Sequence, residues 1–425
     1  MNRHPQSARA KIRRLAFGRL ISVTGGAAAY TALSFTVWER THSPAMQALS
    51  LLLTFGVAGL LGPFAGALGD RFDRRKVMVL SEAVAAAFFL AMAFARTPMQ
   101  LIVLAFGSAI AEQPFFSASR AAIPNLVEDE TQLSWANSLV TIGVHSGIAV
   151  GPVLGGVLWV HVGPSWVFAL NAATFLVSLA LTLTIRGRFQ EDAAHRAGAS
   201  DEHAGLIAGL AFLWNDRVQR RMAIAWLVFV LGMGMGMVAD AALAESFGAG
   251  AVGFSLLIAC WGTGSVVGSA AGRWMTPRTE PVWMVLGAFG VSAMAFAVGF
   301  TPLFPVVLIA LFLMGTSDGL TIVSENGIMQ RRTPDAVRSR TMAAFEAVIS
   351  LGLAVSYLLA GPVLEVFGPR STYRIGGVTA GLAALALLPL LKLRREAPTP
   401  EPAPARYTSA EELDAIKAPV LDTTA

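Results

Sequence analysis

Twelve apolar runs, each long enough to cross a lipid bilayer, limit the folds open to this chain. A helix of about 20 apolar residues spans the hydrocarbon core of a membrane. Inside lipid the backbone must satisfy its own hydrogen bonds, so helices are the expected form of these runs. They cover residues 15–37, 45–68, 77–95, 99–118, 133–159, 166–185, 222–243, 252–272, 281–300, 303–328, 342–363 and 375–391. The sequence therefore predicts an all-α membrane protein with twelve transmembrane helices.

The composition agrees with a membrane protein. Hydrophobic residues make up 55% of the chain and charged residues 14%, whereas about 25% of residues are charged in a typical soluble domain. The only cysteine, Cys260, lies in an apolar run. A single cysteine cannot form a disulfide bond within the chain.

The positions of the basic residues predict how the chain is oriented. If the N-terminus is cytoplasmic, 27 of the 32 Lys and Arg residues fall in cytoplasmic segments and 4 in external loops. Such a difference is typical of membrane proteins, whose cytoplasmic loops are basic. It predicts cytoplasmic termini, contact with anionic lipid and no nucleic-acid partner. The first apolar run is expected to remain as an uncleaved helix.

A polar segment in the middle divides the chain into two parts. Hydrophobic residues recur at helical spacing before residue 215, which indicates a short amphipathic helix in this segment. Six apolar runs lie on each side, as expected for two pseudo-symmetric six-helix halves. The predicted segments are a cytoplasmic N-terminus (1–14), the first half (15–185), a cytoplasmic central loop (186–221), the second half (222–391) and a disordered tail (392–425).

The loop at residues 66–78, GALGDRFDRRKVM, resembles the loop 2–3 signature of the major facilitator superfamily. Its D-R-F-D-R-R string is similar to the branch that contains enterobactin exporters and related transmembrane secretion effectors. It departs from the superfamily pattern at Gly69 and Asp73. The matching positions with an expected role are Gly66, Asp70, Arg71, Arg74 and Arg75. The resemblance implies the major facilitator fold.

The same resemblance implies a conformational gate at this loop. Asp70 is expected to pair with Arg338 or Arg340, or to face the N-terminus of the helix that follows them. Either contact would hold the two halves together on the cytoplasmic side. The alternative is that the basic residues of the loop only anchor the topology.

The fifth apolar run contains GIAVGPVLGGVL at residues 147–158, which resembles the span 5 pattern of the superfamily's antiporters. The spacing of its glycines predicts a smooth face that another helix can approach closely. The matching residues are Gly147, Gly151, Pro152, Gly155 and Gly156. The resemblance implies export rather than uptake, and the alternative is an ordinary packing interface.

Ionisable residues inside apolar runs are costly and therefore suggest function. Asp318 is the leading candidate for a proton carrier, with Glu325 and Glu112 as competitors. Asp240 is a further candidate, although it is also consistent with a position at the outer membrane surface. Arg19 is expected either to reach the inner surface or to contact an acidic substrate.

The resemblance implies that spans 1, 4, 7 and 10 line a central cavity. Bulky side chains on these spans are the candidates for its wall. They are Phe115, Phe116, Trp226, Met233 and Met237. Methionines in such a wall are also consistent with simple packing.

Together these observations predict a secondary transporter, not an enzyme. The sequence contains no phosphate-binding loop and no cluster of metal ligands, so neither a cofactor nor a metal is expected. The predicted activity is proton-coupled efflux of small amphipathic molecules by a monomer in a bacterial inner membrane. The alternatives are a dedicated exporter of a self-made metabolite such as a siderophore and, less favoured, a nutrient importer.

Overall fold

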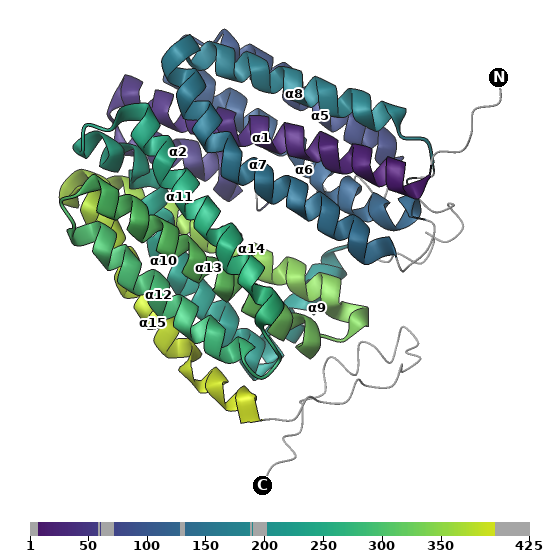
Figure 1. Cartoon of the computed structure of the whole chain (residues 1–425), viewed down its shortest axis with the longest axis vertical. Coiled ribbons are helices and arrows are strands. Elements are labelled where there is room, and N and C mark those ends of the chain that lie inside the picture. The colour runs from purple at the N-terminus through teal and green to yellow at the C-terminus, as the bar shows by residue number, and fades with distance from the viewer. Residues whose placement is uncertain are drawn as a thin grey trace.

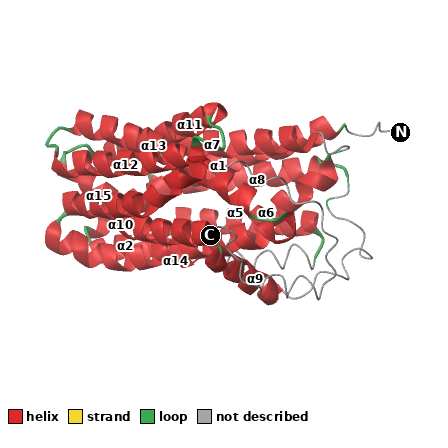
Figure 2. Cartoon of the chain, turned by 90° about the horizontal axis from the view of Figure 1, so that it is seen from below, coloured by secondary structure: helices red, strands yellow, loops and turns green. Residues whose placement is uncertain are grey.

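The computed structural model describes residues 7–57, 60, 72–127, 132–187, 189 and 202–395. Within these residues every regular element is a helix, and the long helices run roughly along one direction (Figure 2). Eleven of the described helices are long and apolar enough to cross a membrane. The second predicted span is described as a shorter apolar helix over Pro44–Val57.

The first half of the chain forms one bundle (Figure 1). Its second helix widens into a π-helix, η1, directly after α2. The elements are α1 (Ala8–Thr41), α2 (Pro44–Leu51), η1 (Leu52–Val57), α5 (Arg74–Ala93), α6 (Pro98–Leu126), α7 (Leu133–Val162) and α8 (Pro164–Thr184).

The second half forms the other bundle (Figure 1). Helix α10 begins at Arg217, inside the segment expected to be a loop, because the carboxylate of Asp216 caps its first turn. The elements are α9 (Glu202–Asn215), α10 (Arg217–Ser246), α11 (Gly250–Ala270), η4 (Ala271–Trp274), α12 (Glu280–Phe300), α13 (Phe304–Arg332), α14 (Asp335–Phe367), α15 (Pro369–Leu387) and η5 (Leu388–Arg395).

Local sequence signals set many of these boundaries. Thr97 and Gln100 form a capping box at the start of α6, with proline in its first turn. This arrangement satisfies backbone N–H groups that the helix leaves free. Gly163 separates α7 from α8 with a φ of 82°, which is a backbone conformation that glycine adopts without strain.

The two bundles meet at one end, which we call the closed end. This end contains the last turns of α1 and α10. The Trp38 indole N–H donates a hydrogen bond to the Glu245 carboxylate across the bundles. Phe35 and Phe254 stack nearby with ring centroids 6.0 Å apart. Toward the other end, which we call the open end, the bundles diverge (Figure 1).

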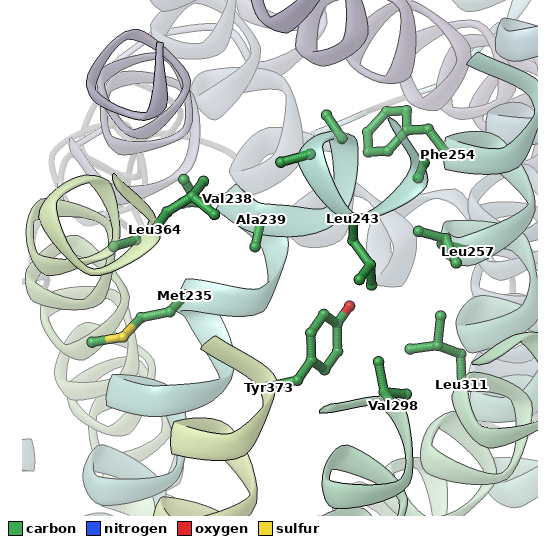
Figure 3. Packing of buried hydrophobic residues seen from close by; sticks show 14 of the residues in the cluster. Met235, Val238, Ala239, Leu243, Phe254, Leu257, Val298, Leu311, Leu364 and Tyr373 are labelled. Atoms are coloured by element: carbon green, nitrogen blue, oxygen red, sulfur yellow. The ribbon is translucent and has the colours of Figure 1, made fainter. Parts of the chain in front are cut away.

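A shared apolar core stabilises the closed end. Phe35 and Trp38 of α1 belong to the same buried cluster as Leu243 of α10 and Phe254 of α11. In the second half, the Tyr373 ring lies between Leu243 and Val298 in this cluster (Figure 3). Apolar side chains of the two bundles are therefore in contact with each other at the closed end.

Candidate functional site: the central cavity

A cavity of about 710 Å³ lies between the two bundles. Its wall is mostly apolar and unusually aromatic, which suits a ligand with a large hydrophobic surface. The aromatic lining residues are Tyr30, Phe55, Phe115, Phe116, Phe175, Trp226, Phe229, Phe254, Trp261 and Tyr373.

In the first half, Arg19 occupies the cavity wall and is 7% exposed. Its guanidinium carbon lies 5.1 Å from the ring centroid of Phe115 and 4.5 Å from that of Phe116. At these distances a cation is attracted to the aromatic faces. Arg19 thus lies within the bundle, among its aromatic neighbours, instead of reaching the membrane surface.

Two glutamates share this region with Arg19. Glu112 of α6 accepts a 3.0 Å hydrogen bond from the Tyr30 hydroxyl of α1. Glu82 of α5 is 1% exposed as a residue and also lines the cavity. Glu112 and Glu82 are the carboxylates whose charges act on Arg19. The first half therefore contains a buried cluster in which the positive charge of Arg19 is close to the negative charges of Glu82 and Glu112.

In the second half, Asp240 of α10 lines the cavity and accepts a hydrogen bond from the Tyr373 hydroxyl of α15. This bond connects two helices that pack closely along their lengths. Asp240 also lies six residues before the end of α10, near the closed end.

Asp318 occupies the middle of α13 and is 7% exposed. It lines the cavity, and among the described residues its carboxylate has no hydrogen-bond or ion-pair partner. Glu325, two turns further along, is also buried but is not part of the cavity lining. The polar groups that act on Glu325 are Asp318, Glu346 and Trp226.

The expected wall residues of α10 also lie at the cavity. Trp226, Met233 and Met237 all line it. The Trp226 ring packs edge-on against Phe229, with centroids 4.9 Å apart. Met237 accepts a hydrogen bond from the Tyr357 hydroxyl on its sulfur at 3.4 Å.

The glycines of the fifth run lie against α1. A Cβ added at Gly147 would lie 2.9 Å from the backbone nitrogen of Thr24. At Gly151 it would lie 2.6 Å from the carbonyl oxygen of the same residue. At Gly155 it would lie 2.8 Å from Cα of Ala28. Helices α1 and α7 therefore pack backbone to backbone over three turns, a spacing that only glycine permits at these positions.

The two remaining residues of this motif face other surroundings. Pro152 lines the cavity. A Cβ at Gly156 would lie 2.6 Å from Cβ of Ser255 on α11, in the other bundle. The motif thus joins α7 to its own bundle on one face and to the opposite bundle on another.

Part of the loop 2–3 motif lies outside the described residues. This applies to Gly66, Asp70 and Arg71, and also to the side chain of Arg338 in α14. Arg74 and Arg75 form the first turn of α5. The Arg75 guanidinium donates to the carbonyl oxygen of Leu183 and lies 5.8 Å from the Phe189 ring centroid. Arg340 is exposed near the start of α14.

Glu82, Tyr30 and Tyr373 line the cavity but were not among the candidates chosen from sequence. Glu82 closely follows a basic loop in the sequence, which suggests pairing with that loop, yet it lines the cavity near Arg19. Tyr30 and Tyr373 contribute the hydroxyl donors to Glu112 and Asp240. Acids inside apolar runs are visible in sequence, but their partners come from distant helices and carry no local signal.

The part of the chain that the structure describes contains no group of three His, Cys, Asp or Glu residues arranged to hold a metal ion. The polar and aromatic groups that the described residues place at the cavity are carboxylates, the Arg19 guanidinium, hydroxyls and aromatic rings. Such groups can bind and release an organic molecule or a proton.

Two helical bundles around a central cavity are the architecture of a secondary transporter. The Major Facilitator Superfamily matches residues 15–334 and 234–422, so this chain belongs to that superfamily. It is a multi-pass membrane transporter. It is 26% identical over 402 residues to the enterobactin exporter EntS of Citrobacter koseri, covering 91% of this chain and 94% of that one. An Escherichia coli enterobactin exporter EntS is 25% identical over 394 residues, covering 90% and 92%.

Solved structures show the same fold. A bacterial homologue of the human lysosomal transporter Spinster, inward-facing and unoccupied, superimposes with a TM-score of 0.67 at 15% identity, covering 92% of this chain and 97% of that one. The nucleoside transporter NupG gives a TM-score of 0.67 at 15% identity, covering 91% and 100%. The predicted fold class is thereby confirmed.

Proposed function

We propose that this protein exports small amphipathic molecules from the cell by alternating access, driven by proton entry. The cavity between the bundles is the observation that carries this proposal. It is large enough for a small organic molecule and is lined by aromatic rings. In alternating access, such a site opens to one side of the membrane at a time as the two halves rock.

The orientation follows the charges of the helix ends. Basic residues in the first turns of α1, α5 and α10 belong to the open end, whereas Arg40 and Arg370 belong to the closed end. With basic segments facing the cytoplasm of a bacterial inner membrane, the structure corresponds to an inward-facing state. Both termini are then cytoplasmic, next to anionic lipid. We further propose that the protein acts as a monomer.

Proton coupling is supported by the buried acids. Asp318 lacks a partner among the described residues and faces the cavity, which makes it the leading carrier. Glu112 and Asp240 are competing sites, although each already accepts a tyrosine hydrogen bond. Glu325 is a further competitor deeper within the second half.

A dedicated role in export of a self-made metabolite is the second candidate. It is favoured by the similarity to enterobactin exporters over nine-tenths of the chain. The aromatic lining is also compatible with a catecholate ligand, because flat rings stack on one another.

An efflux assay tests the proposal. Cells that lack their main efflux pumps would express the protein and be loaded with amphipathic dyes, antibiotics or an iron-free catecholate siderophore. We expect lower retention of at least one compound, and loss of that effect when a protonophore is added. Unchanged retention of all of them, together with uptake of a nutrient, would show that the direction is wrong.

A further inference from the structure

The charges on the cavity wall are unequal. Among the described residues, the charged side chains that line it are one arginine, Arg19, and four acids: Glu82, Glu112, Asp240 and Asp318. Burial of a charge without compensation is costly. The cavity therefore requires positive charge from another source when its acids are ionised.

The single arginine is not free to supply this charge to a ligand. Phe115 and Phe116 lie close to its guanidinium, and Glu112 and Glu82 act on it electrostatically. An anionic ligand near Arg19 would also lie near these two carboxylates. Like charges at such distances repel each other, so this region disfavours an anion.

Asp318 is different from the other acids of the wall because it has neither a hydrogen-bond donor nor a nearby opposite charge among the described residues. Glu112 and Asp240 each accept a tyrosine hydrogen bond. The carboxylate oxygens of Glu82 also lack a hydrogen bond, but Arg19 provides a positive charge near them. Asp318 has none of these contacts and is more than nine-tenths buried, with its side chain at the cavity. Two further acids, Glu325 and Glu346, act on the same region of the second half, and Arg120 of α6 partly offsets the charge of Glu346.

Two tryptophans line the same cavity as Asp318. Trp226 and Trp261 line the cavity in the second half, on α10 and α11. The face of an indole ring attracts organic cations, with a strength of about 0.5–2 kcal/mol per contact. An unpaired carboxylate combined with aromatic faces is therefore suited to an organic cation.

We propose that the cavity selects apolar or aromatic molecules that carry a positive charge, and that Asp318 is the counter-charge for the bound cation. This inference rests on the proposed export function and defines its substrate class. A neutral molecule would leave an ionised Asp318 without a counter-charge until it binds a proton, and an anion would add to the excess of negative charge.

Two probes of nearly equal shape and opposite charge test the charge preference. Tetraphenylphosphonium is a cation and tetraphenylborate an anion, each with four phenyl rings. Their binding to the purified full-length protein in nanodiscs would be measured calorimetrically, with empty nanodiscs as the blank for partition into lipid. We expect saturable binding of tetraphenylphosphonium, and at least tenfold weaker protein-specific binding of tetraphenylborate.

Variants then test the assignment to Asp318. We expect Asp318→Asn to weaken tetraphenylphosphonium binding about tenfold or more, because it removes a buried opposite charge. Asp318→Glu should restore much of the affinity. Glu365→Gln is the matched control, since it removes one negative charge from an exposed position near the end of α14. Thermal unfolding would establish that each variant is folded.

Equal binding of the two probes, or tighter binding of the borate, would overturn the charge preference without any variant. Full phosphonium affinity in folded Asp318→Asn would overturn the role of Asp318. The comparison of the two probes and the comparison of the variants both measure binding without a proton gradient, so they do not depend on the export assay. Efflux of an anionic or neutral compound without phosphonium binding would reject this inference alone, whereas phosphonium binding without efflux of any compound would reject the export function alone.

Discussion

The indole N–H of Trp38 donates a hydrogen bond to the carboxylate of Glu245, connecting the last turn of α1 to the last turn of α10. His42 lies beside the same carboxylate, with its Nδ1 atom 3.5 Å away. These are contacts between the two halves at the closed end. In a transporter that alternates between two states, they must separate when that end opens.

Trp38→Phe should therefore favour opening of the closed end. The substitution keeps an aromatic ring in the shared core but removes the donor to Glu245, and a hydrogen bond to a charged group contributes about 1.5–3 kcal/mol. Spin labels at Arg40→Cys and Ser246→Cys, in a Cys260→Ser background, would report the distance between the bundles. We expect a larger population of long distances.

The control for this experiment is Trp166→Phe, because Trp166 is 64% exposed on α8. An unchanged distance distribution in Trp38→Phe would mean that the hydrogen bond does not hold the closed end together.

Gly155→Ala should separate α1 from α7 and destabilise the protein. Its Cβ would lie 2.8 Å from Cα of Ala28, which is backbone and cannot move aside alone. Overpacking of this kind costs about 1–3 kcal/mol. The readouts are thermal unfolding and the yield of monodisperse protein. Gly26→Ala on α1 is the control, since no atom lies within 4 Å of its added Cβ, and equal stability of the two variants would contradict the prediction.

Asp318→Asn should abolish proton movement coupled to substrate. The amide cannot ionise, so it cannot pick up and release a proton as the cavity changes sides. Proteoliposomes loaded with a pH-sensitive dye would report proton flux when substrate is added, and exchange of labelled substrate should persist at concentrations high enough to offset the weaker binding. Glu112→Gln and Glu325→Gln would be measured in parallel. If Asp318→Asn keeps full proton flux while one of these two variants loses it, the proton is carried by that acid and not by Asp318.

Tyr373→Phe should destabilise the second half more than Asp240→Asn does. Loss of the Tyr373 hydroxyl leaves the Asp240 carboxylate in the cavity without that donor, at a cost of about 1–3 kcal/mol. The asparagine variant keeps an acceptor for the hydroxyl and carries no charge. Thermal unfolding of both variants would reveal the order, and the reverse order would show that the hydrogen bond is dispensable.

The sequence predicted the fold well because lipid imposes a strong pattern on a helix. Apolar runs corresponded to helices throughout the described residues. The acids inside those runs were visible in the sequence, and the resemblance to the superfamily implied that their helices line the cavity, where the structure has Glu112, Asp240 and Asp318.

The features that the sequence did not predict depend on contacts between residues far apart in the chain or on local backbone geometry. Glu82 follows a basic loop in sequence, but the rotation of α5 directs it to the cavity near Arg19. The start of α10 at Arg217 was not predicted either, because a polar N-cap and three nearby arginines resemble a loop in a hydropathy pattern. The π-helical turn at Leu52–Val57 has no apparent signature in its apolar sequence.

Gly156 of α7 meets Ser255 of α11 with almost no side-chain atoms between the two helices. This close contact affects how the two bundles can move relative to each other. When one rigid body turns about a point of contact on another, each atom moves in proportion to its distance from that point. A rotation of a few degrees there leaves the backbones at Gly156 almost stationary and moves the far ends of the bundles by several times as much. If the two halves rock about this contact, the small side chains of Gly156 and Ser255 allow the backbones to stay close while the far ends of α7 and α11 separate.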